Sequence, residues 1–116
     1  MARNSNRLDR VNEELKREIS QVINYELHNS NVTGMISVTR VKISPDLRHA
    51  KVFVSIFNSK NVKKTLEGLK KSEGFIRSRV ASTVNLRVTP ELVFIHDDSE
   101  EQGARIDKIL RELKGN

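Results

Sequence analysis

The chain has 116 residues, a length typical of one domain, and we expect a single domain over residues 1–116 with flexible ends at 1–4 and 115–116. It contains no cysteine, which excludes disulfides and thiolate metal sites, and its 4% aromatic content argues against an aromatic-rich stacking platform for single-stranded nucleic acid. Its apolar stretches are too short for a membrane-spanning helix, and the N-terminus lacks the apolar core of a signal peptide, so we expect a cytoplasmic protein.

Positive charge is concentrated in the middle of the sequence. The net charge is +6, from 21 Lys and Arg against 15 Asp and Glu. Residues 29–84 hold eleven basic and three acidic residues, a net charge of +8, whereas residues 1–28 are neutral and residues 85–116 carry −2. A localised positive surface is typical of a protein that binds a polyanion. The other interpretation is a basic protein whose lysines only keep it dispersed, and composition alone leaves both open.

The first predicted element is an amphipathic helix from about Ser5 to Leu27. Its apolar residues recur at spacings of three and four, which places them on one stripe of a helix. They are Leu8, Val11, Leu15, Ile19, Val22 and Leu27. Gly34 marks the turn that follows.

Two strands follow, over residues 35–43 and 50–57, and Pro45 between them favours a tight turn and an antiparallel hairpin. The apolar alternation of the first strand shifts by one residue near Thr39, which predicts a bulge there. Phe53 and Phe57 alternate on the second strand like base-stacking residues, but we expect them to pack under a helix, because Phe is scarce and the core needs it.

A helical pattern then runs from Val62 into Ser72-Glu73-Gly74 and resumes at Phe75. Glycine in mid-helix costs about 1 kcal/mol relative to alanine, so it is placed where a helix bends or another backbone comes close. We therefore predict two short helices joined at Gly74.

The last elements are a strand over residues 91–96, able to pair parallel to the second strand, and a helix beginning at Asp98 or Ser99. The acidic residues around this start are explained better by helix capping than by paired catalytic carboxylates. The fold class is therefore α+β, with one three-stranded sheet covered by helices.

The sequence resembles the ribosome-binding factor A family over nearly its whole length. The residues that carry the resemblance are Gly74-Phe75-Ile76-Arg77, Pro90-Glu91-Leu92, Phe94, Asp97 and Pro45-Asp46-Leu47. The resemblance implies a type II KH-like fold in the order α-β-β-α-α-β-α. The family has a kink, usually written Ala-x-Gly, in place of the KH domain's GxxG loop, and here the kink residues are Ser72, Glu73 and Gly74.

The resemblance also implies a function. It implies a non-catalytic assembly factor that binds the precursor of the small (30S) ribosomal subunit and its 16S ribosomal RNA. It implies support of late maturation, of 5′-end processing and of growth in the cold, and release by a ribosome-associated GTPase. The alternative is a KH-type module that binds single-stranded messenger or regulatory RNA, against which the missing GxxG loop counts.

The candidate RNA contacts are basic residues around the kink and on the hairpin. Lys70, Lys71, Arg77 and Arg79 bracket the kink, where Gly74 would let the RNA backbone approach. Further candidates are Lys63 and Lys64 on the same helix, and Arg40, Lys42, Arg48 and Lys51 on the hairpin. Each could instead be a solvated surface charge, and sheet edges commonly carry lysine to block aggregation.

No catalytic, metal or cofactor site is predicted. His28, His49 and His96 have no metal-ligand spacing, and the sequence has no phosphate-binding glycine loop or nucleophile motif. We expect a monomer, because the apolar residues are accounted for by stripes that face the core.

Overall fold

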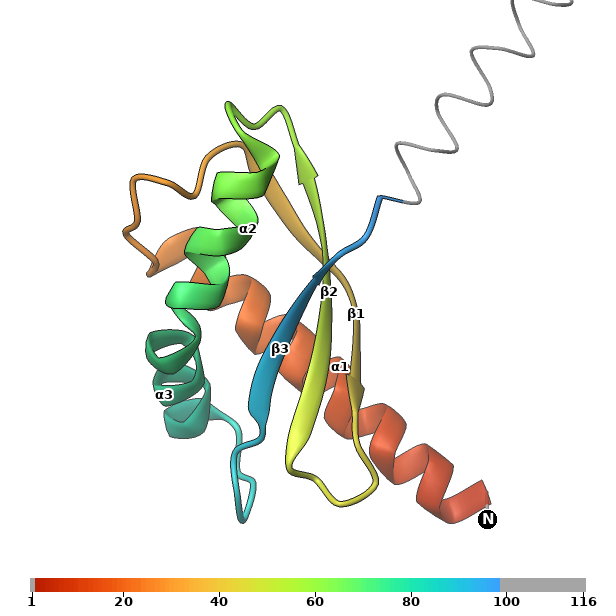
Figure 1. Ribbon diagram of the computed structural model, residues 1–116. Helices are drawn as coiled ribbons and strands as arrows, with labels where there is room; N and C mark the ends of the chain where they lie inside the picture. Colours follow the sequence, from red (N-terminus) through yellow and green to blue (C-terminus); the bar gives the residue numbers. More distant parts are fainter. Residues whose placement is uncertain (1, 99–116) are drawn as a thin grey trace, which may run out of the picture.

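The computed structural model describes residues 2–98, with side chains from Arg7 onward (Figure 1). The elements are α1 (Ala2–Tyr25), β1 (Met35–Ile43), β2 (His49–Phe57), α2 (Val62–Lys71), α3 (Glu73–Thr83) and β3 (Glu91–His96). Their order confirms the predicted α+β fold up to the third strand. The predicted last helix lies outside the described residues.

The sheet has the strand order β1-β2-β3. β1 and β2 pair antiparallel, and β2 and β3 pair parallel, as predicted. The register shifts between Val38 and Arg40, which confirms the bulge at Thr39. The Thr39 hydroxyl lies 3.2 Å from the Phe53 carbonyl oxygen and 2.8 Å from the Asp97 carboxylate, so the bulge is tied to β2 and to the residue directly after β3.

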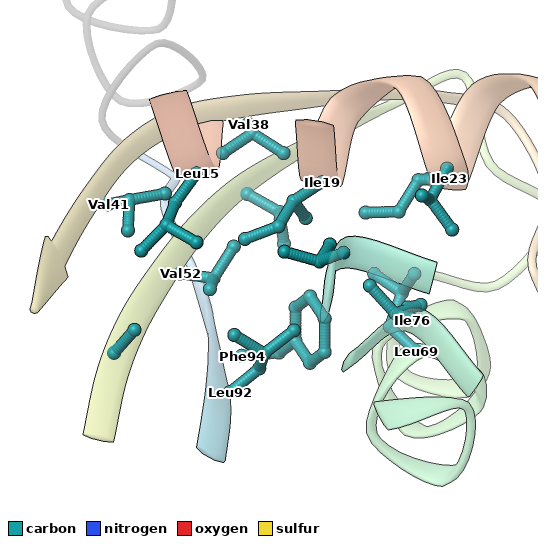
Figure 2. Packing of buried hydrophobic residues seen from close by; sticks show 14 of the residues in the cluster. Leu15, Ile19, Ile23, Val38, Val41, Val52, Leu69, Ile76, Leu92 and Phe94 are labelled. Atoms are coloured by element: carbon teal, nitrogen blue, oxygen red, sulfur yellow. The ribbon is translucent and has the colours of Figure 1, made fainter. Parts of the chain in front are cut away.

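All three helices pack against one face of the sheet, and the core fills the space between them (Figure 2). Alternate residues of each strand point toward the helices, as the period of two requires. α1 contributes Leu15 and Ile19, and the helix pair contributes Leu69 and Ile76, all of them fully buried. This one-sided packing decides which strand residues are covered.

The opposite face of the sheet is not covered by any element of residues 2–98, and we call it the open sheet face. Phe57 is 66% exposed and its cross-strand partner Met35 is 69% exposed. The prediction that Phe53 and Phe57 pack under a helix is therefore wrong, because both lie on strand positions that point away from the helices. The expected monomer rested on every apolar residue facing the core, and that premise is also wrong.

The loop before β1 is held against α2. Thr65 is fully buried, and its hydroxyl lies 2.8 Å from the Ser59 hydroxyl and 3.1 Å from the Asn31 carbonyl oxygen. At Gly68 a Cβ would lie 2.8 Å from Val32 Cγ2, so this glycine allows the loop to approach the helix. These contacts fix α2 relative to the start of β1.

Candidate nucleic-acid interface

The joint between α2 and α3 is a single residue, Ser72. It has φ −89° and ψ 5°, and its N–H donates to the carbonyl oxygens of Gly68, at 3.0 Å, and Leu69, at 3.1 Å. Its own carbonyl oxygen accepts a hydrogen bond from the Ile76 N–H. The two helices are therefore distinct, as predicted, but they meet at Ser72 and not at Gly74.

Gly74 lies in the first turn of α3 and is exposed. Its φ is not positive, and a Cβ placed on it would meet nothing within 4 Å. The predicted conformational reason for this glycine is therefore wrong. What Gly74 provides is a stretch of helix backbone beside the joint that no side chain covers.

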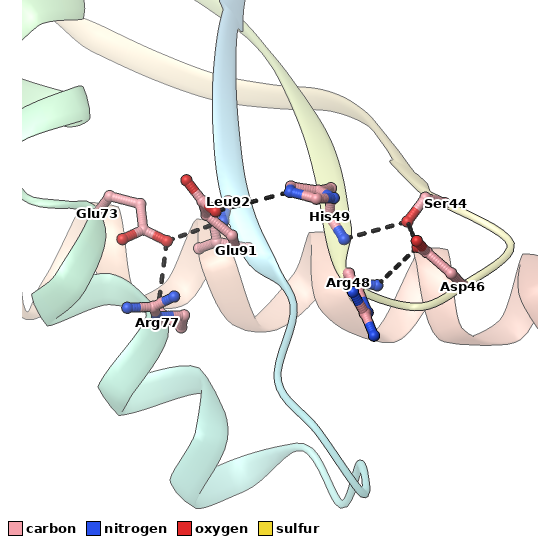
Figure 3. A network of polar contacts seen from close by, with 8 residues as sticks. All are labelled: Ser44, Asp46, Arg48, His49, Glu73, Arg77, Glu91 and Leu92. Atoms are coloured by element: carbon pink, nitrogen blue, oxygen red, sulfur yellow. Dashed lines mark hydrogen bonds and ion pairs between the residues drawn. The ribbon is translucent and has the colours of Figure 1, made fainter.

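Both sides of the joint are anchored. The Asn29 side-chain amide donates to the Ser72 hydroxyl at 3.3 Å, which ties the joint to the loop after α1. The Glu73 carboxylate accepts a 2.8 Å hydrogen bond from the Leu92 N–H at the start of β3 (Figure 3). The joint is thus held in place by contacts to sequence-distant elements.

Four lysines of α2 form an exposed surface, which we call the α2 lysine face: Lys63, Lys64, Lys70 and Lys71. The members of each pair seven residues apart lie about 10 Å apart along the helix axis, on nearly the same side of the helix. The ion pairs found among residues 7–98 involve none of these lysines. Because Lys70 and Lys71 also stand in the last turn of α2, part of their role is to stabilise the helix end.

The two predicted arginines of α3 each pair with a carboxylate. Arg77 and Arg79 are two residues apart, so their side chains point about 200° apart around the helix. The buried side chain of Val80 lies on the side of the helix between them. Arg77 Nε lies 3.7 Å from the Glu73 carboxylate, and Arg79 Nη2 lies 2.8 Å from the carboxylate of Glu26 in the segment after α1. The predicted set of four around the kink therefore consists of two lysines without an ion pair among residues 7–98 and two partly exposed arginines that each have one.

The hairpin cations lie elsewhere. Arg40, Lys42 and Lys51 are exposed on the open sheet face, opposite the helices. Arg48 belongs to the turn between β1 and β2, where its N–H donates to the Asp46 carboxylate at 3.0 Å. The lysines of the α2 lysine face and the three cations of the hairpin strands thus lie on two separate surfaces.

The turn carries a carboxylate held in its charged form. The Ser44 hydroxyl donates to Asp46 at 2.6 Å, and this bond, followed by the Arg48 N–H, lowers the pKa of Asp46 below its ordinary value (Figure 3). The negative charge beside Arg48 weakens the turn as a phosphate contact.

Sequence reasoning missed one residue beside the joint. Phe75 is placed by its sequence on the resumed apolar stripe of α3, but it is 44% exposed, and the Arg79 guanidinium lies 5.8 Å from its ring centroid. The sequence carried one sign of this exposure. Phe75 directly precedes Ile76, and neighbouring residues of a helix point about 100° apart, so the two side chains cannot both point straight into the core.

Other kinds of site find little support in this part of the chain. Within residues 2–98 there is no group of three or more His, Asp or Glu side chains placed to hold a metal ion. In the same range, no helix has the length and apolar character to cross a bilayer.

The chain is similar to known proteins over most of its length. The family model for ribosome-binding factor A matches residues 7–110. The ribosome-binding factor A of Clostridium novyi is 52% identical over 109 residues, covering 93% of this chain and 90% of that protein. That of Clostridium tetani is 48% identical over 111 residues, covering 95% and 92%.

Solved structures resemble the fold. The crystal structure of ribosome-binding factor A from Thermus thermophilus has a TM-score of 0.69 at 24% identity, covering 77% of this chain and 93% of that one. A solution structure of a putative ribosome binding factor A from Thermotoga maritima has a TM-score of 0.63 at 26% identity, covering 77% and 85%. A homology model of the Thermus protein, fitted into a map of a 30S complex, has a TM-score of 0.63 at 24% identity, covering 75% and 91%.

Proposed function

The chain belongs to the ribosome-binding factor A family, and we propose that it is a non-catalytic assembly factor that binds the small ribosomal subunit. The 30S complex of the Thermus thermophilus relative supports this proposal. In the same proposal, the chain acts in the cytoplasm as one domain without a cofactor.

The observation that carries the proposal is the α2 lysine face. Four exposed lysines without an ion-pair partner among residues 7–98 stand next to a joint whose first α3 turn has uncovered backbone at Gly74. Lysine ammonium groups neutralise phosphates and release counterions, which supplies most of the affinity of such contacts. A glycine beside them lets an RNA strand come close to the helix backbone.

The structure of the joint favours ribosomal RNA over the alternative ligand. A KH module binds single-stranded messenger or regulatory RNA with a GxxG loop that clamps the sugar-phosphate backbone. Here a single residue, Ser72, separates α2 from α3, so there is no loop to form a clamp. An exposed helical lysine face suits the backbone of a folded RNA, which is recognised largely by shape and phosphate position.

The finer parts of the proposal concern the maturation pathway. The bound RNA is the 16S ribosomal RNA of a late 30S precursor, binding supports 5′-end processing and growth in the cold, and a ribosome-associated GTPase releases the factor. These steps are supported by the family membership of the chain.

The test is co-sedimentation of the tagged protein with small subunits. We expect the wild type to sediment with small subunits and not with polysomes or free RNA. The variant with Lys63, Lys64, Lys70 and Lys71 replaced by alanine should lose this association. Arg10→Ala, which removes one exposed charge from the electrically neutral α1 region, is the control. Full association of the four-lysine variant would overturn the role of this face.

A further inference from the structure

The open sheet face presents its side chains in rows that cross the strands. Next to the hairpin turn, His49 and Glu91 form an outward-facing pair, with His49 Nε2 3.7 Å from the Glu91 carboxylate. From there to the far end, the rows are Lys42–Lys51–Val93, Arg40–Phe53–Ile95, Ser37–Ser55 and Met35–Phe57. Successive rows lie about 7 Å apart, because every second residue of a strand faces the same way. Lysine and arginine are therefore concentrated toward the turn end of this face, where Glu91 pairs with His49, and exposed apolar groups lie at the other end.

The first row contains a like-charge pair. Lys42 and Lys51 are direct partners on antiparallel strands, which places their Cβ atoms about 5 Å apart. Both are exposed, and no ion pair among residues 7–98 involves either of them. Directly opposed like charges destabilise a sheet. An anion bound between the two ammonium groups would remove this repulsion.

The second row contains a cation–π contact. The Arg40 guanidinium lies 4.3 Å from the centroid of the Phe53 ring, and Arg40 is exposed. A hollow of about 460 Å³ opens beside this contact, and its wall also includes Ile95, His96, Asp97 and Asp98. The Thr39 hydroxyl in the same hollow is hydrogen-bonded to Asp97. Guanidinium planes and aromatic rings are the groups on which unpaired bases stack.

The last row adds an exposed aromatic surface. Phe57 and Met35 are each about two-thirds exposed and lie side by side as cross-strand partners. Phe is among the residues most often buried, and here its exposed ring and the neighbouring Met35 form a small apolar surface that a base could cover. The combination of cations with stacking groups is the pattern of single-stranded nucleic acid binding.

We propose that the open sheet face binds unpaired nucleotides, as a second RNA-contacting surface opposite the α2 lysine face. Phosphates lie at Lys42 and Lys51, and bases stack at Arg40–Phe53 and at Phe57. The proposal rests on the proposed function, since the RNA would be that of the small subunit. The protein would then lie between two RNA segments, one on each side of its sheet.

Charge favours this ligand over a second copy of the chain. In a two-fold interface with its axis along the strands, the cations of one open sheet face would meet those of the other, and with its axis across the strands they would be buried against the apolar end, which does not neutralise them. An RNA strand supplies the opposite charge at the same place.

The experiment follows backbone amide shifts of the full chain by NMR as a short oligouridylate is added at low salt. We expect shifts at outward positions of β1 and β2, and much weaker binding of a DNA duplex. Phe57→Ala should weaken oligouridylate binding about tenfold, as loss of base stacking does. The control is Val88→Ala, which also removes an exposed apolar side chain, 62% exposed and outside the sheet.

The variant Lys51→Glu separates binding from folding. It turns the like-charge pair with Lys42 into an opposite-charge pair, so the melting temperature should rise while oligouridylate affinity falls about tenfold. A more stable protein that binds less RNA cannot be a folding artefact. Unchanged affinity in Lys51→Glu and Phe57→Ala would overturn the inference.

Three other outcomes would also overturn it. Amide shifts confined to α2 would be consistent with the proposed function but would show that the open sheet face does not bind the oligonucleotide. Concentration-dependent shifts of the strand amides without RNA would identify a second copy of the chain as the occupant. Strand shifts that require deletion of residues 99–116 would identify that segment as the occupant. By contrast, failure of the wild type to sediment with small subunits would contradict the proposed function. Strand shifts caused by the oligonucleotide would still show that the open sheet face binds unpaired nucleotides.

Discussion

The Leu92 N–H donates a 2.8 Å hydrogen bond to the Glu73 carboxylate, and this bond joins the first turn of α3 to the start of β3. The same carboxylate lies 3.7 Å from Arg77 Nε. One side chain therefore holds the helix joint in place relative to the sheet. Its position in the first turn of α3 is also favourable for a negative charge.

Replacing Glu73 tests this anchor. We expect Glu73→Ala to lower the free energy of unfolding by about 2 kcal/mol, because it leaves a partly buried N–H without its charged acceptor. Glu73→Gln should lose less, since its amide oxygen still accepts the bond. Urea denaturation measures both. Glu67→Ala, on the exposed side of α2, is the control and should change stability by less than about 0.5 kcal/mol. Equal effects at positions 67 and 73 would contradict the anchoring role.

Gly74→Ala should raise stability and lower subunit binding. Alanine has a higher helix propensity, by about 1 kcal/mol, and the added Cβ meets no protein atom. The same Cβ covers helix backbone that the RNA is expected to approach, so binding should weaken. Thermal unfolding and co-sedimentation measure the two effects. A stabilised protein with unchanged binding would show that the joint does not face the RNA.

Gly68→Ala should have the opposite effect on stability, although it lies in the neighbouring helix. The added Cβ would lie 2.8 Å from Val32 Cγ2, and the overpacking should outweigh the gain in propensity and cost about 1 kcal/mol net. The double variant with Val32→Ala should recover part of this loss, which a double-mutant cycle measures. Additive losses would mean that the strain arises elsewhere.

The turn carboxylate gives a prediction about pH. The Ser44 hydroxyl and then the Arg48 N–H lower the pKa of Asp46 in the folded protein. Because the pKa is lower in the folded state, the charged Asp46 carboxylate stabilises the fold at pH values above the unfolded pKa of 3.8. This stabilisation is lost as the pH falls through the folded pKa. Ser44→Ala should move the pKa of Asp46 up toward 3.8, as followed by carboxyl NMR titration. An unchanged titration would show that the 2.6 Å bond does not stabilise the charged form.

Salt dependence measures the phosphate contacts of the α2 lysine face. Each lysine that neutralises a phosphate contributes roughly 0.7 to 0.9 to the slope of log affinity against log salt. Replacing Lys63, Lys64, Lys70 and Lys71 by alanine should therefore make the slope for subunit binding shallower by roughly 3. Arg10→Ala should leave the slope unchanged. A slope that is the same in the four-lysine variant would place the phosphate contacts elsewhere.

The strands and the bulge could be predicted from sequence because their signals are local. Alternation of apolar and polar residues fixes which side chains share a face, and a change of phase at Thr39 marks the extra residue. The outward face of β2 also carries Lys51 and Ser55, a polar pattern that marks the uncovered face. The exposure of Phe57 was missed because the scarcity of Phe was given more weight than this pattern.

One ion pair of the candidate site could not be predicted, because it joins residues far apart in the sequence. Arg79 looks like any helical arginine in the sequence, and its partner Glu26 stands more than fifty residues earlier. The joint was misplaced for a different reason. Glycine is the strongest local breaker signal, but the backbone angles at Ser72 are open to any residue type, so no sequence signal marks that position.

The parallel pairing of β2 with β3 has a consequence for the order of folding. β2 ends at Phe57 and β3 begins at Glu91. Pairing these two strands therefore closes a long loop that contains the whole helix pair. The β1–β2 hairpin closes a short turn and carries a far smaller loss of chain entropy. We expect hairpin contacts in the rate-limiting transition state and third-strand contacts after it. Val38→Ala should therefore slow refolding, whereas Phe94→Leu should mainly accelerate unfolding.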